Sequence, residues 1–203
     1  MNRLARFSLS SRPAAWAAVV ALLLLSLPPA RAALESSMSA QMLLQFPLLA
    51  LCGFLLAGAL PRAWRGRIDA WNAHGISGLF ATAVIMALLM IPRLLDLALA
   101  DARIDLAKSL ALVLCGAALR VSWRRAGFLV QGFFLGNVLP MMAAVGQLYQ
   151  DSPLRLCNAY LLDDQVRLGQ MLVGLAVAVG LAWFARLLLA LVRQDGAAAL
   201  GQH

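Results

Sequence analysis

Long apolar runs alternate along this chain with short loops that hold most of its charged residues. Runs such as Met38–Leu60 and Ala126–Leu148 are longer than the roughly 18 to 20 apolar residues with which a helix crosses a bilayer. They are continuously apolar, whereas strands of a membrane barrel would alternate apolar and polar residues in segments of about ten. The pattern therefore predicts an all-α fold, a polytopic integral membrane helix bundle. The five expected membrane-spanning helices are Met38–Leu60, Ile76–Leu95, Leu106–Leu119, Ala126–Leu148 and Leu168–Val192.

The first 32 residues have a different pattern. Three arginines precede an apolar stretch, Ala14–Leu27, of only 14 residues, and an Ala-Arg-Ala site that ends at Ala32 follows a pair of prolines. A basic region, a short apolar region and a small-residue site are typical of a secretory signal peptide. We therefore expect residues 1–32 to be a signal peptide cleaved after Ala32, or an uncleaved signal anchor that adds a sixth span. Residues 33–203 are expected to form a single transmembrane helical domain.

The charges are distributed unequally between the two sides of the predicted membrane. If the basic N-terminus is cytoplasmic, the loops on that side hold eleven basic and two acidic residues, and the opposite side holds six basic and seven acidic residues. Basic residues favour the cytoplasmic side of membrane proteins. This bias predicts a bacterial inner-membrane protein with its mature N-terminus in the periplasm and its C-terminus in the cytoplasm. The net charge of +8 follows from this topology. We expect the lipid bilayer, and no nucleic acid, as a partner.

The chain lacks the residue combinations of several chemistries. Its two histidines, His74 and His203, lie outside the predicted spans. A membrane cytochrome of the bis-histidine type needs paired imidazoles inside its helices, so no haem is expected. The chain also has no serine, histidine and aspartate system and no glycine-rich phosphate loop, so we predict no catalytic residues and no enzymatic activity.

Sulfur side chains are the remaining candidates for metal chemistry. Thioethers are soft ligands suited to Cu(I), and Met38 and Met42 share a helix face at a spacing of four. The candidate ligands, most of them expected near the outer face, are Met38, Met42, Met90, Met141, Met142 and Cys157. In the alternative interpretation the methionines only fill gaps between apolar helices. Cys157, in the outer loop, is then a structural or intermolecular thiol.

Charged residues gather where the second span ends and the third begins. Asp105 and Lys108 are three residues apart, as are Arg93 and Asp96. We interpret them as local pairs at helix ends whose long stems reach the membrane interface, with a docking or ion-entry patch as the alternative. Asp163 and Asp164 precede the last span, where carboxylates complement a helix N-terminus.

Two stretches carry a similarity to a known family. They are Ser39–Gln45 with the following Pro47-Leu48-Leu49, and Met90–Asp96 with the following Ala98-Leu99-Ala100. The first resembles the first characteristic helix of the bacterial cytochrome c oxidase assembly factor family, and the second is similar to that family's Trp-His-x-Pro signature. The resemblance covers roughly residues 39–123, under half of the chain. It implies a polytopic membrane protein linked to copper delivery into respiratory oxidase, with oxidase subunits as partners.

The chain departs from this family at its histidines. Gln41, Gln45 and Met90 stand where imidazoles are expected, and the next helix offers Asp105 and Lys108. The resemblance therefore leaves two readings, a site in which thioethers replace imidazoles and a relative that binds no metal. Our leading hypothesis is a non-enzymatic accessory protein of respiratory oxidase biogenesis that handles Cu(I) on the periplasmic side.

Two other classes of function fit the sequence. A small transporter or permease component would use polar side chains such as Gln45, Asn137 and Gln147 along a path. A structural subunit of a membrane complex would pack against its partner through Gly132 and Gly136, a spacing that permits close helix approach.

Overall fold

The computed structural model describes residues 11–157 and 160–200, and the regular secondary structure of these residues is helical, with no strand. The predicted all-α fold is confirmed. In chain order the helices are α1 (Ser11–Ser26), α2 (Pro28–Leu34), α3 (Met38–Ala40), the π-helical turn η1 (Gln41–Gln45), α4 (Phe46–Ala57), α5 (Arg62–Trp71), α6 (Ile76–Leu89), α7 (Pro92–Ala100), α8 (Ala102–Trp123), α9 (Phe128–Asp151) and α10 (Leu162–Leu200).

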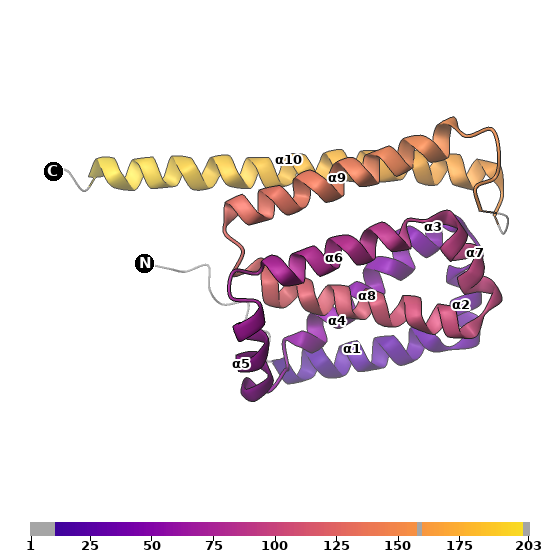
Figure 1. Cartoon of the computed structure of the whole chain (residues 1–203), viewed down its shortest axis with the longest axis horizontal. Helices are drawn as coiled ribbons and strands as arrows, with labels where there is room; N and C mark the ends of the chain where they lie inside the picture. The colour runs from indigo at the N-terminus through magenta and orange to yellow at the C-terminus, as the bar shows by residue number, and fades with distance from the viewer. Residues whose placement is uncertain (1–10, 158–159, 201–203) are drawn as a thin grey trace.

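The helices form a bundle with α8 packed against both α4 and α6 and with α1 packed against α4. A second layer consists of α9 and α10, which pack along each other and contact the bundle through α6 and α3 (Figure 1). The amphipathic α5 lies at one end of the bundle, and α2, α7 and the connection between α9 and α10 lie at the other (Figure 1). We call the latter the α2–α7 end.

Three helical segments are long and apolar enough to cross a membrane, namely Met38–Ala57, Phe128–Asp151 and Leu162–Val192. The number rises to five if each of two bent pairs, α1 with α2 and α6 with α7, counts as one span. The third predicted span is not among them. It lies within α8, which has 22 residues but carries ionisable side chains in its first two turns. These charges lower its mean hydropathy, and the helix packs between α4 and α6.

The two bends occur at prolines. The predicted span Ile76–Leu95 is broken at Ile91, and the axes of α6 and α7 differ by 75°. Ile91 is extended because the ring of Pro92 disfavours the helical conformation in the preceding residue, and Pro92 then begins the next helix. Leu27 is likewise extended before Pro28, and α1 and α2 differ by 79°. Both short helices therefore turn across the α2–α7 end.

Glycines bring the backbones of α4 and α8 into contact. A Cβ atom on Gly53 would lie 1.8 Å from the carbonyl oxygen of Val113, and one on Gly116 would lie 1.7 Å from that of Ala50. Each helix thus places a glycine against the other's backbone. In contrast, a Cβ on Gly136 would meet nothing within 4 Å, and one on Gly132 would meet only the Trp183 ring, at 3.0 Å. The predicted small-residue pair is therefore not the closest crossing in the bundle.

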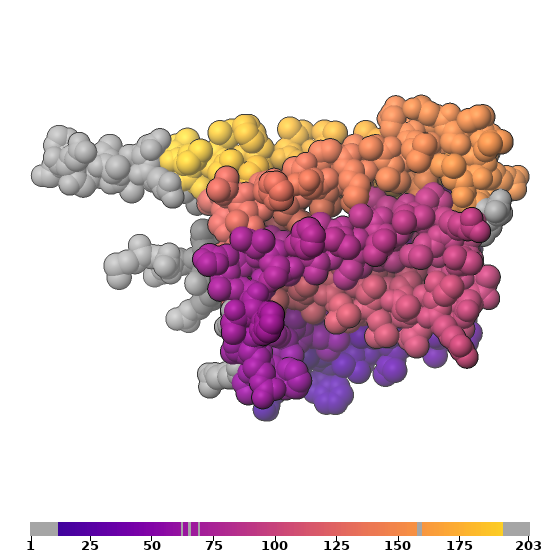
Figure 2. All heavy atoms as spheres, viewed as in Figure 1, coloured from indigo at the N-terminus to yellow at the C-terminus, as the bar shows by residue number. Residues whose placement is uncertain are grey.

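The outward surface of the bundle is apolar, as expected for contact with lipid. Phe80, Phe133 and Leu181 are among its large exposed side chains, at 69, 74 and 64% exposure. The space-filling view shows α9 and α10 as a layer along one side of the bundle (Figure 2). Only 6% of the spanning window of α10 is buried, against 44% for Met38–Ala57, so α10 depends on lipid or another protein to cover it.

Candidate functional site

Buried polar and charged side chains converge at the α2–α7 end. They come from five segments far apart in sequence: α2 with the residue after it, η1, α8, the connection before α10, and the first turn of α10. The members of this polar network are Arg31, Glu35, Gln41, Gln45, Asp105, Lys108, Tyr160 and Asp164. Intramembrane ionisable groups are costly and commonly mark functional sites.

The ion pair between Asp105 and Lys108 is at the centre of the network. Lys108 Nζ lies 2.8 Å from Asp105 Oδ1, and the two side chains are only 1% and 8% exposed. Arg31 Nη2 lies 2.5 Å from the other carboxylate oxygen of Asp105, and Lys108 Nζ is 3.8 Å from Glu35 Oε1. The ammonium also lies 5.9 Å from the centre of the Phe46 ring. The predicted pairing of Asp105 with Lys108 is confirmed, but the predicted reach of the lysine to the interface is wrong, because Glu35 and Phe46 lie against its buried ammonium.

The contact between Asp105 Oδ1 and Lys108 Nζ is close but poorly directed. Neither atom makes a hydrogen bond of normal geometry to a described residue, although their separation is that of an ion pair. We regard the attraction as genuine, since Coulomb energy depends on distance and falls little with misalignment. Asp105 Oδ1 and Lys108 Nζ can therefore still form further hydrogen bonds, although both atoms are buried.

The π-helical turn η1 supplies two buried amides. Gln45 Nε2 donates to Glu35 Oε1 at 3.2 Å, and the Tyr160 hydroxyl donates to Gln41 Oε1 at 2.9 Å. The remaining polar atom of each amide, Gln41 Nε2 and Gln45 Oε1, is buried without a partner among the described residues. Short π-helical turns are frequent at functional sites. These glutamines stand where the family resemblance led us to expect imidazoles.

Carboxylates of the last helix close the same end. Asp164 accepts hydrogen bonds from the backbone N–H of Met38 and from Ser39 Oγ, the latter at 2.7 Å. It therefore caps the N-terminus of α3. Asp163 and Asp164 both lie in the first turn of α10, which confirms the prediction that they complement a helix N-terminus. The additional capping of α3 by Asp164 was not predicted, because it depends on how α10 packs.

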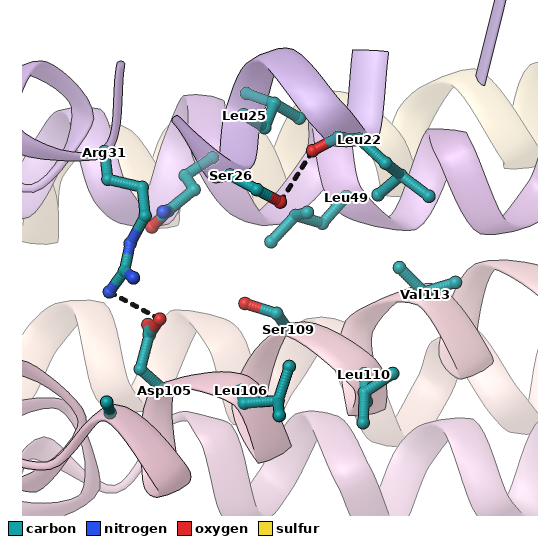
Figure 3. A pocket seen from close by; sticks show the side chains of 12 residues that line it. Leu22, Leu25, Ser26, Arg31, Leu49, Asp105, Leu106, Ser109, Leu110 and Val113 are labelled. Atoms are coloured by element: carbon teal, nitrogen blue, oxygen red, sulfur yellow. Dashed lines mark hydrogen bonds and ion pairs between the residues drawn. The ribbon is translucent and has the colours of Figure 1, made fainter. Parts of the chain in front are cut away.

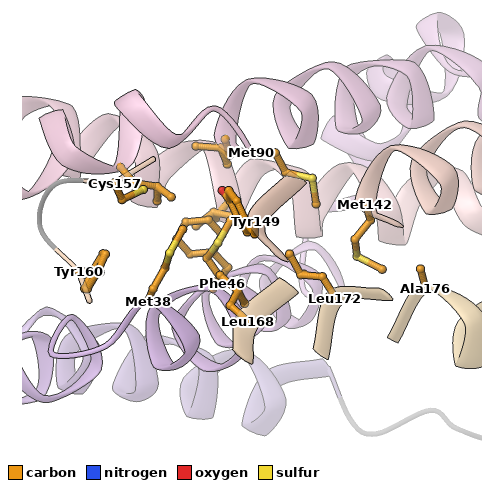
Figure 4. Packing of buried hydrophobic residues seen from close by; sticks show 14 of the residues in the cluster. Met38, Phe46, Met90, Met142, Tyr149, Cys157, Tyr160, Leu168, Leu172 and Ala176 are labelled. Carbon is orange, nitrogen blue, oxygen red and sulfur yellow. The ribbon is translucent and has the colours of Figure 1, made fainter. Parts of the chain in front are cut away.

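The structure brings five of the six predicted sulfur ligands into one buried cluster (Figure 4). Met38 is fully buried, and Met42, Met90 and Met142 are 7, 7 and 8% exposed. The fifth member is Cys157, at 1% exposure. The sixth predicted ligand, Met141, is partly buried and packs against the same cluster. Aromatic rings, including Phe46 and Tyr149, lie among these side chains (Figure 4).

Cys157 is held inside the connection between α9 and α10. Its Sγ is 3.5 Å from the carbonyl oxygen of Pro92, to which the thiol donates. Burial, and secondarily the negative charge of Asp96, raise the pKa of this thiol to about 12. The thiolate, which is the form that binds metals, is thus disfavoured at neutral pH. Asn158, the next residue of this connection, lies outside the described residues.

A cavity of about 440 Å³ lies between α1, α4 and α8, beside the polar network. Figure 3 shows Arg31 and Asp105 at one end of it, Ser26 and Ser109 further along, and leucines and Val113 towards the other end. None of the predicted sulfur ligands lines it. No sequence pattern predicted this cavity, since it depends on the packing of α1.

Other predicted site residues do not converge. Gln45 is buried in the network, whereas Asn137 and Gln147 are exposed on α9, so these three share no polar path. Among the described residues, no three or more His, Cys, Asp or Glu side chains are grouped to hold a metal ion.

Comparisons with known proteins give no relative for this chain: no family model, no curated protein and no solved structure matches it.

Proposed function

We propose that this protein is a non-enzymatic accessory protein of respiratory oxidase biogenesis in the bacterial inner membrane, and that its sulfur cluster binds Cu(I) on the periplasmic side. The observation that carries the proposal is that Met38, Met42, Met90, Met142 and Cys157 all belong to the same buried hydrophobic cluster. They are contributed by α3, η1, the break between α6 and α7, α9 and the connection that follows. The excess of basic residues in the loops at the opposite end supports a periplasmic location for the α2–α7 end.

The chemistry of these donors suits a soft monovalent ion. Thioethers bind Cu(I) without losing a proton, and four of the five clustered sulfurs are thioethers. Cys157 would contribute as a thiolate only after deprotonation, which its raised pKa opposes. The methionines would therefore hold the ion, and its role would be that of cargo passed to an oxidase subunit.

Copper binding tests the proposal directly. The full chain, purified in mild detergent under reducing, anaerobic conditions, is titrated with Cu(I) against a chromophoric chelator. We expect about one Cu(I) per chain in the parent protein and loss of binding in Met42→Leu/Met90→Leu, because leucine keeps the volume and removes the soft donor. Met171→Leu is the matched control, since Met171 is 52% exposed on α10 and outside the cluster.

The alternative explanation of the cluster is space-filling by methionine. It predicts no Cu(I) binding in the parent protein, or binding that the double variant leaves unchanged, and either result rejects the copper proposal. The oxidase assignment has its own test. Deletion of the gene in its host is expected to lower copper-oxidase activity, with recovery when the parent gene is restored but not when the double variant is supplied.

A second candidate function is that of a structural subunit in a membrane complex. It is favoured by α10, which packs on α9 but has only 6% of its spanning window buried. Co-purification of a stoichiometric partner with the parent chain, lost when exposed residues of α10 such as Leu181 are replaced by tryptophan, would favour this function over copper handling.

A further inference from the structure

The cavity between α1, α4 and α8 is polar at one end and apolar at the other. Arg31 and Asp105 close the polar end, and Leu22, Leu110 and Val113 lie towards the apolar end (Figure 3). Its volume of about 440 Å³ falls in the range of pockets that bind small molecules. This change from a polar to an apolar lining suits an elongated amphiphile whose polar head group lies beside the polar network.

The polar end holds an acceptor that nothing in the described chain satisfies. Gln45 lines the cavity and is 3% exposed, and its Oε1 is buried without a donor. An unpaired buried amide oxygen destabilises the fold, so a ligand group that reaches it and donates a hydrogen bond is favoured. Ser109 presents its hydroxyl to the same cavity (Figure 3) and offers a second hydrogen-bonding group.

The charges around this end favour a neutral head. Arg31 is bound to Asp105 at 2.5 Å and lies 3.7 Å from Glu35, so its charge is compensated before a ligand arrives. An anionic head would face both of these carboxylates, and it would offer only acceptors to Gln45 Oε1. A hydroxyl group donates to the amide oxygen and accepts from Ser109 or from the unused N–H groups of Arg31.

The cavity is bordered by residues of the lipid-facing surface. Leu106 and Leu110 line it and are 61% and 55% exposed on α8. A ligand that enters past these leucines crosses an apolar surface, which suits the chain of a lipid. We propose that this cavity binds a neutral, single-chain lipid whose head carries a hydroxyl group. This proposal is independent of copper binding, since no member of the predicted sulfur set lines the cavity.

Native mass spectrometry of the full chain in mild detergent tests the proposal. The probe is 1-monolauroylglycerol, and lauric acid at pH 8 is the matched anionic lipid with the same chain length. We expect one bound monolauroylglycerol per chain, and binding of laurate that is at least about tenfold weaker because it cannot donate to the amide. Gln45→Leu is expected to lower the affinity for monolauroylglycerol to a similar extent.

A second variant separates loss of binding from loss of folding. Leu110→Trp leaves the polar network intact and fills the apolar end, so we expect it to fold and to lose the bound lipid. Asn137→Leu is the control, since this exposed amide on α9 is remote from the cavity lining and its replacement is expected to leave binding unchanged. Equal binding of laurate, unchanged binding in both Gln45→Leu and Leu110→Trp, or an absence of monolauroylglycerol binding would each overturn the proposal.

Discussion

At the scale of single residues, the most consequential feature is the buried pair of Asp105 and Lys108. Sequence spacing was sufficient to predict that the two side chains pair, because residues three apart in a helix are neighbours. It was insufficient to predict their burial. The position of Asp105 near the start of α8 suggested a wet interface, whereas Arg31, Glu35 and Phe46 lie against the pair from segments that are distant in sequence.

This arrangement predicts a specific order of stabilities. Asp105→Leu leaves Lys108 and Arg31 without their shared carboxylate, and removal of one member of a buried ion pair typically costs about 3 to 5 kcal/mol. We therefore expect Asp105→Leu to lower the apparent Tm in detergent more than the double variant Asp105→Leu/Lys108→Met, which removes both central charges. Thermal unfolding followed by circular dichroism measures the order. A double variant that is less stable than Asp105→Leu would show that the pair contributes net stability and would contradict the prediction.

At the scale of the elements, the crossing of α4 and α8 fixes the centre of the bundle. Gly53 and Gly116 each meet the partner's backbone at a distance that admits no side chain. Backbone atoms cannot move aside as a flexible side chain can, so a methyl group at either position must separate the helices. The separation would also disturb the polar network and the cavity, both of which use residues of α8.

We expect Gly53→Ala and Gly116→Ala to lower the yield of folded protein and to reduce the apparent Tm. Overpacking typically costs about 1 to 3 kcal/mol, and a clash with backbone belongs at the upper end of that range. Gly136→Ala is the matched control. Its Cβ would meet nothing within 4 Å, and alanine is the better helix former, so this variant is expected to be at least as stable as the parent. If Gly136→Ala destabilised the protein as much as Gly53→Ala, the close α4–α8 crossing at Gly53 would not be the cause, and the prediction would be wrong.

The helices and the close contacts between them differ in how far sequence could predict them. Apolar runs predicted the spans within α4, α9 and α10 well, because hydropathy is a property of each segment alone. The bend at Pro92 was not predicted, although its signal was present in the extended conformation that proline imposes on Ile91. A Gly-x-x-x-Gly spacing drew attention to Gly132, whereas the isolated Gly53 and Gly116 had no such spacing. Only the position of the partner backbone identifies them.

The sequence predicted some of the residues of the candidate site but did not predict how they are arranged in space. The sequence singled out the methionines, and five of the six predicted sulfur ligands share one cluster. The polar network was missed as a unit because its members come from five segments and pair across more than a hundred residues, as Tyr160 does with Gln41. The cavity was missed because it depends on how the first helix packs, and the sequence left open whether that helix is retained.

At the scale of the whole molecule, the N-terminal segment is an integral part of the packing. α1 packs against α4 and lines the cavity with Leu22 and Leu25, and Arg31 in α2 binds Asp105. Cleavage after Ala32 would remove all of these contacts and would expose the Asp105–Lys108 pair. The sequence left a signal peptide and a signal anchor as alternatives, and the contacts favour the anchor.

We therefore expect the protein extracted from membranes to retain its first helix. Its intact mass should correspond to the 21.7 kDa of the full chain, apart from loss of the initiator methionine, and not to a species that begins at Ala33. Arg31→Gln, which keeps the helix and removes the ion pair with Asp105, is expected to lower the apparent Tm, whereas Arg12→Gln is a control outside that pair. Because α1 begins and α10 ends at the same end of the bundle (Figure 1), retention also predicts that both termini lie on one side of the membrane. Protease digestion of the N-terminal and C-terminal tags from opposite sides of the membrane would contradict the anchor. A mature chain that begins at Ala33 would also contradict it, and such a chain would lack the helix that lines the lipid cavity.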